Sequence, residues 1–89
     1  MTEPIPPQVL LSADQLGQLL RATRKRLKLS QGHIGQRLNL SQNRVSYLEL
    51  HPGDLSLKQL MNWCAALNLE LRLGAKDTGL HQGPQGQEW

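Results

Sequence analysis

The segment from Ser30 to Leu50 constrains the fold most, because it holds two short helical patterns separated by only a few residues. Ser30 and Ser41 are of the type that begins a helix by accepting a hydrogen bond from a free backbone amide. They predict helices over residues 31–38 and 42–50. Two short helices joined by about three residues cannot pack antiparallel, so they must cross steeply.

The residues at this crossing are suited to it. Gly35 is the smallest possible residue where the third helix must approach closely, and Asn39 tolerates the positive φ that the turn needs. Leu40 and Val45 are expected to fill the space between the helices, and Leu48 continues that face. Helical spacing alone also fits an ordinary helical hairpin, but the small residue, the turn and the apolar plug together favour a helix-turn-helix.

Two further helices are predicted on either side of this pair. Ser12 with Gln15, and Ser56 with Gln59, have the spacing of a capping box, in which each side chain satisfies a free amide of the first turn. We expect the first helix to end near residues 27–29. The residues that then recur at helical spacing are Leu16, Leu19, Leu20, Thr23 and Leu27 in the first helix, and Leu57, Leu60, Met61, Cys64 and Leu67 in the fourth.

After the fourth helix the period changes, and three leucines alternate with Glu70 and Arg72. This is the pattern of a half-buried strand. A lone strand is not stable in water, so we expect it to pair with the same strand of a second copy across a two-fold axis. The alternative is that residues 70–74 continue the fourth helix. The expected dimerisation residues are Leu69, Leu71 and Leu73.

These patterns predict an all-α fold of about four or five helices with one short C-terminal strand that pairs across a homodimer. With 89 residues the chain is one domain at most. Residues 1–10 contain three prolines and predict a flexible arm, residues 11–76 the helix-turn-helix and dimerisation domain, and residues 77–89, rich in Gly and Gln, a disordered tail. No apolar run approaches the roughly 20 residues that span a bilayer, and no signal peptide is recognised, so a cytoplasmic location is expected.

Basic residues are concentrated in one part of the chain, whose net charge is +3. Residues 21–44 hold no acidic residue, whereas residues 54–89 hold three basic and four acidic residues, a net charge of −1. One interpretation is that these basic residues form a face that binds a polyanion. The other is that they form a solvated helix face. The basic residues of the first part are Arg21, Arg24, Lys25, Arg26, Lys28, Arg37 and Arg44.

The third predicted helix has the chemistry of a helix that reads duplex DNA in the major groove. Gln42 and Asn43 can each bond bidentately to the N6/N7 edge of adenine, and Arg44 can either read guanine or hold a phosphate. Ser46 and Tyr47 are placed toward the groove, although Tyr47 could equally pack on the sugar–phosphate backbone. Free amides at helix N-termini favour phosphates. The expected DNA-binding residues are Gln31, Ser41, Gln42, Asn43, Arg44, Ser46, Tyr47 and Lys28.

Catalysis, metals and cofactors are not expected. His33, His51 and His81 have no ligand spacing, and no nucleophile–base pair stands out. The single cysteine, Cys64, excludes an internal disulfide and a cysteine zinc site. In its apolar helical pattern it is expected to behave as a small buried hydrophobe.

Residues 30–42 resemble the helix-turn-helix of the phage-repressor type, the Xre/Cro family, and the resemblance covers about residues 13–69. It implies that Gln31 holds a phosphate and braces Gln42, and that Arg24 pairs with Glu49. Dimers of this type read an inverted repeat whose half-sites lie about one helical turn, or a multiple of it, apart.

Two residues depart from the family's pattern. Gly35 and Asn39 stand where Ala and Gly are more usual, and both remain sterically sensible.

The chain ends in Gln87-Glu88-Trp89, and a flexible tether with a large aromatic residue resembles a peptide ligand that fills a pocket. The alternative is a tail residue that has no role or that packs on its own domain. Together with the strand, this ending resembles the HipB antitoxins. That resemblance implies a dimer that represses its own operon and binds a HipA-type serine/threonine kinase toxin through Trp89. A stand-alone repressor, a restriction-modification controller and a protein-interaction scaffold remain as alternatives.

Overall fold

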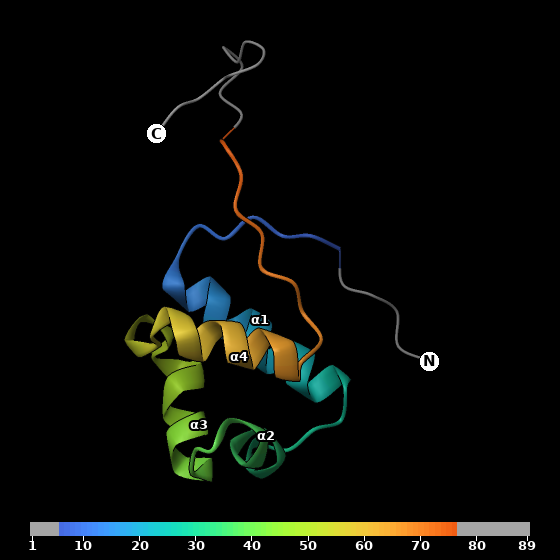
Figure 1. Ribbon diagram of the computed structural model, residues 1–89, viewed down its shortest axis with the longest axis vertical. Coiled ribbons are helices and arrows are strands. Elements are labelled where there is room, and N and C mark those ends of the chain that lie inside the picture. The colour runs from blue at the N-terminus through green and yellow to red at the C-terminus, as the bar shows by residue number, and fades with distance from the viewer. Residues whose placement is uncertain (1–5, 77–89) are drawn as a thin grey trace.

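The computed structural model describes residues 6–76, which fold as four α-helices and a short 3-10 helix (Figure 1). The all-helical fold class is therefore confirmed, and no strand forms within these residues. None of their helices is both long and apolar enough to cross a membrane. The elements are α1 (Ala13–Arg26), α2 (Gln31–Leu38), α3 (Gln42–Leu50), η1 (Pro52–Asp54) and α4 (Leu57–Ala66).

Serine side chains begin all four α-helices, as the sequence predicts. Ser12, Ser30, Ser41 and Ser56 each accept a hydrogen bond from the backbone amide three residues later, at 3.0–3.2 Å. The reciprocal capping box forms only at the start of α4, where the Gln59 side chain also accepts from the Ser56 amide.

At the start of α1 the capping-box prediction is wrong in its second half. The Gln15 side chain does not return to Ser12. It accepts from the Leu11 amide at 2.7 Å and donates to the Val9 carbonyl at 2.7 Å. Gln15 thus ties the preceding segment to the first turn of α1.

Residues with positive φ end three of the helices: Lys28 and Asn39 at 61°, and Asn68 at 59°. After α4, Asn68 lets the Leu69 amide turn back to the Cys64 carbonyl at 2.7 Å, which is the Schellman termination of a helix. The possibility that residues 70–74 continue the fourth helix is therefore wrong. Residues 69–76 form neither helix nor strand within the described chain.

The core draws on every α-helix. The predicted inward residues Ile34, Val45 and Leu48 are fully buried, but Leu57 and Met61 of α4 are exposed. Trp63 is fully buried instead and is the largest residue of the core; the leucine spacing had not singled it out. The complete buried cluster is Leu20, Ile34, Val45, Leu48, Trp63 and Leu67.

Two glycines allow backbone segments to approach one another. A Cβ at Gly35 would lie 2.5 Å from the Leu40 carbonyl oxygen, so the close neighbour of α2 is the turn rather than α3 itself. A Cβ at Gly17 would lie 2.5 Å from the Glu49 carbonyl oxygen, which brings α1 against the end of α3. In Figure 1, α2 and α3 form one end of the molecule, and residues 6–11 and 70–76 lie toward the other.

Candidate nucleic-acid interface

Helix α3 presents a polar outer face and an apolar inner face. Gln42, Asn43, Arg44 and Tyr47 are exposed, and Ser46 is half-buried. The inner residues are Val45, Leu48 and Glu49, all buried. The structure thus places the residues predicted from α3 on one accessible side of a helix whose opposite side is fixed in the core.

The N-terminal ends of α2 and α3 lie close together. The Ser41 hydroxyl accepts from the Arg44 amide at 3.0 Å, so it is engaged in capping α3. The carboxamide oxygen of Gln42 would be 3.6 Å from a Cβ at Gly32, in the first turn of α2. The first turns of both helices therefore lie near one another, and helix N-termini leave backbone amides unpaired, which favours anions.

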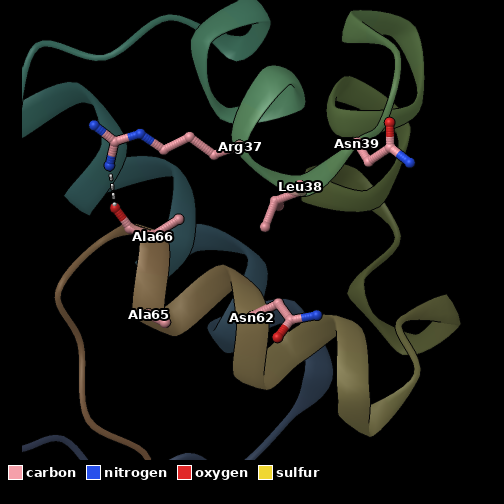
Figure 2. A pocket seen from close by; sticks show the side chains of 6 residues that line it. All are labelled: Arg37, Leu38, Asn39, Asn62, Ala65 and Ala66. Carbon is pink, nitrogen blue, oxygen red and sulfur yellow. Dashed lines mark hydrogen bonds between the residues drawn. The ribbon is translucent and has the colours of Figure 1, made fainter.

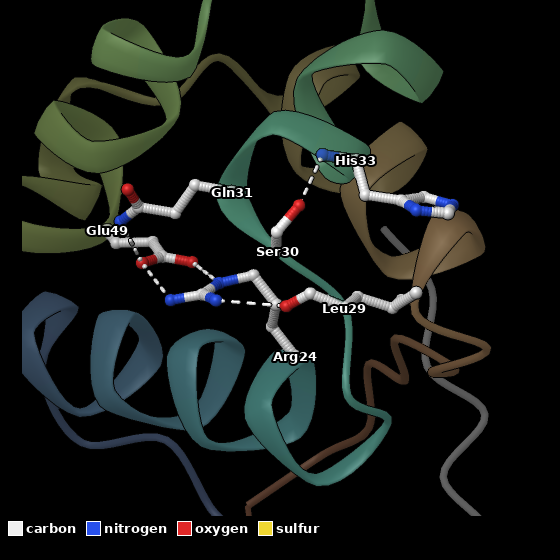
Figure 3. A network of polar contacts seen from close by, with 6 residues as sticks. All are labelled: Arg24, Leu29, Ser30, Gln31, His33 and Glu49. Carbon is white, nitrogen blue, oxygen red and sulfur yellow. Dashed lines mark hydrogen bonds and ion pairs between the residues drawn. The ribbon is translucent and has the colours of Figure 1, made fainter.

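A buried ion pair holds α3 against α1, as the resemblance implied. Arg24 Nε donates to Glu49 Oε2 at 2.6 Å, and Arg24 Nη2 donates to Oε1 at 3.1 Å (Figure 3). The two side chains are only 8% and 2% exposed. Arg24 Nη1 also donates to the Leu29 carbonyl at 3.0 Å, which fixes the connection between α1 and α2.

The Gln31 side chain joins this network rather than bracing Gln42. Its Nε2 donates to Glu49 Oε1 at 3.1 Å (Figure 3), and within residues 6–76 no hydrogen bond links it to Gln42. The expected brace is therefore replaced by a contact with the ion pair. Because a carboxylate only accepts, the amide must present its nitrogen to Glu49, and the second N–H of that nitrogen makes no hydrogen bond among residues 6–76.

Tyr47 is held by three neighbours at the C-terminal end of α3. Its hydroxyl donates to Asp54 Oδ2 in η1, and its ring centroid is 4.5 Å from that of His51. The Arg44 guanidinium carbon lies 5.1 Å from the Tyr47 ring centroid, within range of a cation–π contact. The hydrogen bond to Asp54, with the negative charge of that carboxylate, raises the pKa of Tyr47. The part of Asp54 was missed from the sequence, because α3 ends at Leu50 and the helical period of Tyr47 does not extend to η1.

The basic residues of 21–44 do not form one continuous surface, because two of them make contacts within the fold. Arg24 is buried in the ion pair, and Arg37 donates to the Ala66 carbonyl at the end of α4, at 3.2 Å. Lys25, Arg26 and Lys28 are exposed around the end of α1. A shallow hollow of about 400 Å³ lies between α2 and α4 (Figure 2) and contains none of the predicted DNA-binding residues. It is lined by Arg37, Leu38, Asn39, Asn62, Ala65 and Ala66.

The leucines predicted for dimerisation do not lie in this interface. Leu69 is half-buried against the core, whereas Leu71 and Leu73 are exposed. Trp89, the predicted toxin contact, lies outside the described residues. Cys64 is buried as expected, and desolvation raises the pKa of its thiol.

The described residues contain no cluster of three or more side chains that could hold a metal ion. The chain was compared with protein-family models, with curated proteins and with solved structures, and none of them matches it.

Proposed function

We propose that this chain is a sequence-specific DNA-binding protein that reads the major groove with α3. The observation that carries the proposal is the exposed row of Gln42, Asn43, Arg44 and Tyr47 on a helix fixed from behind by the Arg24–Glu49 ion pair. Such a helix presents hydrogen-bonding side chains in a defined orientation, which base reading requires.

The surroundings of α3 support the same proposal. Gln42 and Asn43 are suited to adenine edges. The first turns of α2 and α3, with the remaining N–H of Gln31, are suited to phosphates. Lys28 and its basic neighbours add attraction that does not depend on sequence and that weakens as the salt concentration rises.

The test compares two exposed asparagines that lie on different helices. Asn43→Ala removes a proposed base contact on α3, whereas Asn62→Ala changes an exposed residue of α4. Binding to a duplex selected by the wild-type chain from a random library is measured by fluorescence anisotropy. We expect Asn43→Ala to lose about 1–3 kcal/mol and to relax the preference at one base pair, with Asn62→Ala unchanged. Equal binding by wild type and Asn43→Ala would show that Asn43 makes no base contact, and a wild-type chain that selects no duplex would favour a protein-interaction scaffold instead.

A two-fold dimer is part of the proposal. Leu71 and Leu73 are exposed in a segment that has no ladder partner within the described chain, and pairing with a second copy would supply one. Such a dimer would read an inverted repeat. Sedimentation of the wild type should show a dimer, and Leu71→Lys should shift it toward the monomer. A wild-type chain that stays monomeric at high concentration would exclude this interface.

The antitoxin function is the more specific proposal, and it depends on the HipB resemblance. In it, the dimer represses its own operon in the bacterial cytoplasm, at the nucleoid, and residues 77–89 with Trp89 bind a HipA-type kinase. Residues 70–76 leave the helical body away from α2 and α3 (Figure 1), so a partner there would leave α3 free for DNA. A kinase that still co-purifies after deletion of residues 77–89 would exclude this contact, whereas the absence of any co-purifying kinase would favour the stand-alone repressor.

A further inference from the structure

Arg44 occupies a different part of α3 from the side chains that face straight outward. Asn43, Tyr47 and Leu50 follow the i, i+4, i+7 spacing of one helix face, and all three are exposed. Arg44 lies one turn before Leu48, which is fully buried. Its stem therefore rises from the border of the exposed face, where a helix inserted in a groove meets the sugar–phosphate backbone rather than the bases.

The position of the Arg44 guanidinium is set by Tyr47, which is itself fixed. Tyr47 contacts His51 through its ring and Asp54 through its hydroxyl. Arg44 forms no ion pair among residues 6–76, so its cation–π contact with Tyr47 is the interaction that orients it. Asp54 therefore acts on Arg44 through the phenol ring.

We propose that Asp54 is a positioning residue for DNA binding: it fixes Tyr47, which in turn holds Arg44 in place for one backbone phosphate. This inference rests on the proposed function. A guanidinium that is already oriented loses less rotational freedom when it binds the phosphate. The gain in affinity is of the size that an exposed cation–π contact supplies, about two- to fivefold.

The direction in which DNA affinity changes when Asp54 is replaced distinguishes a positioning role from an effect of its charge. Asp54 is an exposed acidic residue beside a surface proposed to meet a polyanion. By charge alone, Asp54→Ala would remove repulsion and strengthen DNA binding. By positioning, Asp54→Ala releases Tyr47 and weakens binding despite the loss of a negative charge. Asp54→Asn keeps an acceptor for the Tyr47 hydroxyl and removes the charge, so it should bind at least as tightly as the wild type.

The experiment measures anisotropy of a labelled duplex, selected by the wild-type chain from a random library, and of single-base-pair variants of that duplex, at several salt concentrations. Asp54→Ala should bind about two- to fivefold more weakly. Arg44→Ala should bind more weakly on all sequences and lower the salt slope by about one. In the Arg44→Ala background, Asp54→Ala should no longer weaken binding and should strengthen it. Circular dichroism and the urea midpoint show whether each variant is folded.

Tyr47→Phe supplies a second route if Asp54→Ala disturbs the fold, because it removes the hydroxyl and keeps the ring. It should weaken binding as Asp54→Ala does, and the two effects should not add. The positioning role is overturned if Asp54→Ala or Tyr47→Phe leaves affinity unchanged or raises it while Arg44 is present. The phosphate assignment is overturned if Arg44→Ala affects one base pair only and leaves the salt slope unchanged. A wild-type chain that binds no duplex overturns the proposed function itself.

Discussion

Replacing Glu49 by alanine should remove a large part of the stability of the fold. The substitution leaves the Arg24 guanidinium with its side chain 8% exposed and without its carboxylate, while Gln31 loses its acceptor. Removing one partner of a buried pair costs about 3–5 kcal/mol, since the remaining charge is desolvated without compensation. The 71 described residues are expected to have a total stability of about 4–11 kcal/mol.

The chain contains a matched control for this substitution. Arg72 and Glu70 form an ion pair at 3.2 Å, but their side chains are 70% and 72% exposed. An exposed pair is worth about 0–1 kcal/mol because water and salt screen it. Glu70→Ala should therefore leave stability almost unchanged, although it breaks a salt bridge of similar chemistry.

Urea unfolding followed by far-ultraviolet circular dichroism measures both variants. Glu49→Ala should lower the midpoint strongly or leave the chain partly unfolded in water, and the double variant Arg24→Met/Glu49→Leu should recover much of the loss, because no buried charge is left without a partner. Similar midpoints for Glu49→Ala and Glu70→Ala would refute the reasoning. They would mean that burial of the pair does not control its energetic importance.

Three further predictions concern single positions. Gly35→Ala should lower the free energy of unfolding by about 1–3 kcal/mol, because its Cβ would meet a backbone oxygen at 2.5 Å. In the same helix, a Cβ at Gly32 would have ordinary contacts at 3.6 Å, so Gly32→Ala should be neutral or should stabilise the fold by up to about 1 kcal/mol. Urea unfolding measures both variants. Tyr47 is the single tyrosine, so its absorbance at 295 nm should titrate above the ordinary pKa of 10.0 and should return toward that value in Asp54→Ala. The contact between Tyr47 and Asp54 stabilises the fold below pH 10, and this stabilisation is lost as the pH rises through the raised pKa of Tyr47. Cys64 should react with a disulfide reagent more slowly than a free thiol until denaturant exposes it.

The helix boundaries could be predicted from sequence because they depend on local chemistry. Each serine cap satisfies an amide only three residues away, and Asn39 adopts its left-handed conformation where the turn requires it. Such contacts are encoded within a few residues.

Contacts between distant segments were harder to predict. Gly17 owes its importance to the end of α3, more than thirty residues later, and nothing near it in the sequence signals that approach. Trp63 lies outside the leucine pattern of its helix, yet it is the largest side chain of the core. The Arg24–Glu49 pair was expected only through a family resemblance, since residue spacing does not reveal partners that are twenty-five positions apart.

The residues predicted to bind DNA could be predicted only in part. Their exposure follows from the helical period once α3 is recognised, but their side-chain partners do not. Gln31 was expected beside Gln42 and instead contacts Glu49. Tyr47 was left open between two roles, and its hydroxyl bonds to Asp54. Local periodicity determines which face is free, whereas the three-dimensional packing determines what each side chain touches on it.

The left-handed conformation of Lys28 has a consequence for engineering and for evolution. A residue with a Cβ pays about 1–2 kcal/mol for this conformation, and glycine avoids that cost. In the proposed function, the lysine supplies positive charge close to the DNA, which glycine would remove. A selection for heat resistance alone should therefore favour glycine at position 28, whereas a selection for operator occupancy should retain lysine. At this loop position the stability of the fold and the affinity for DNA favour different residues.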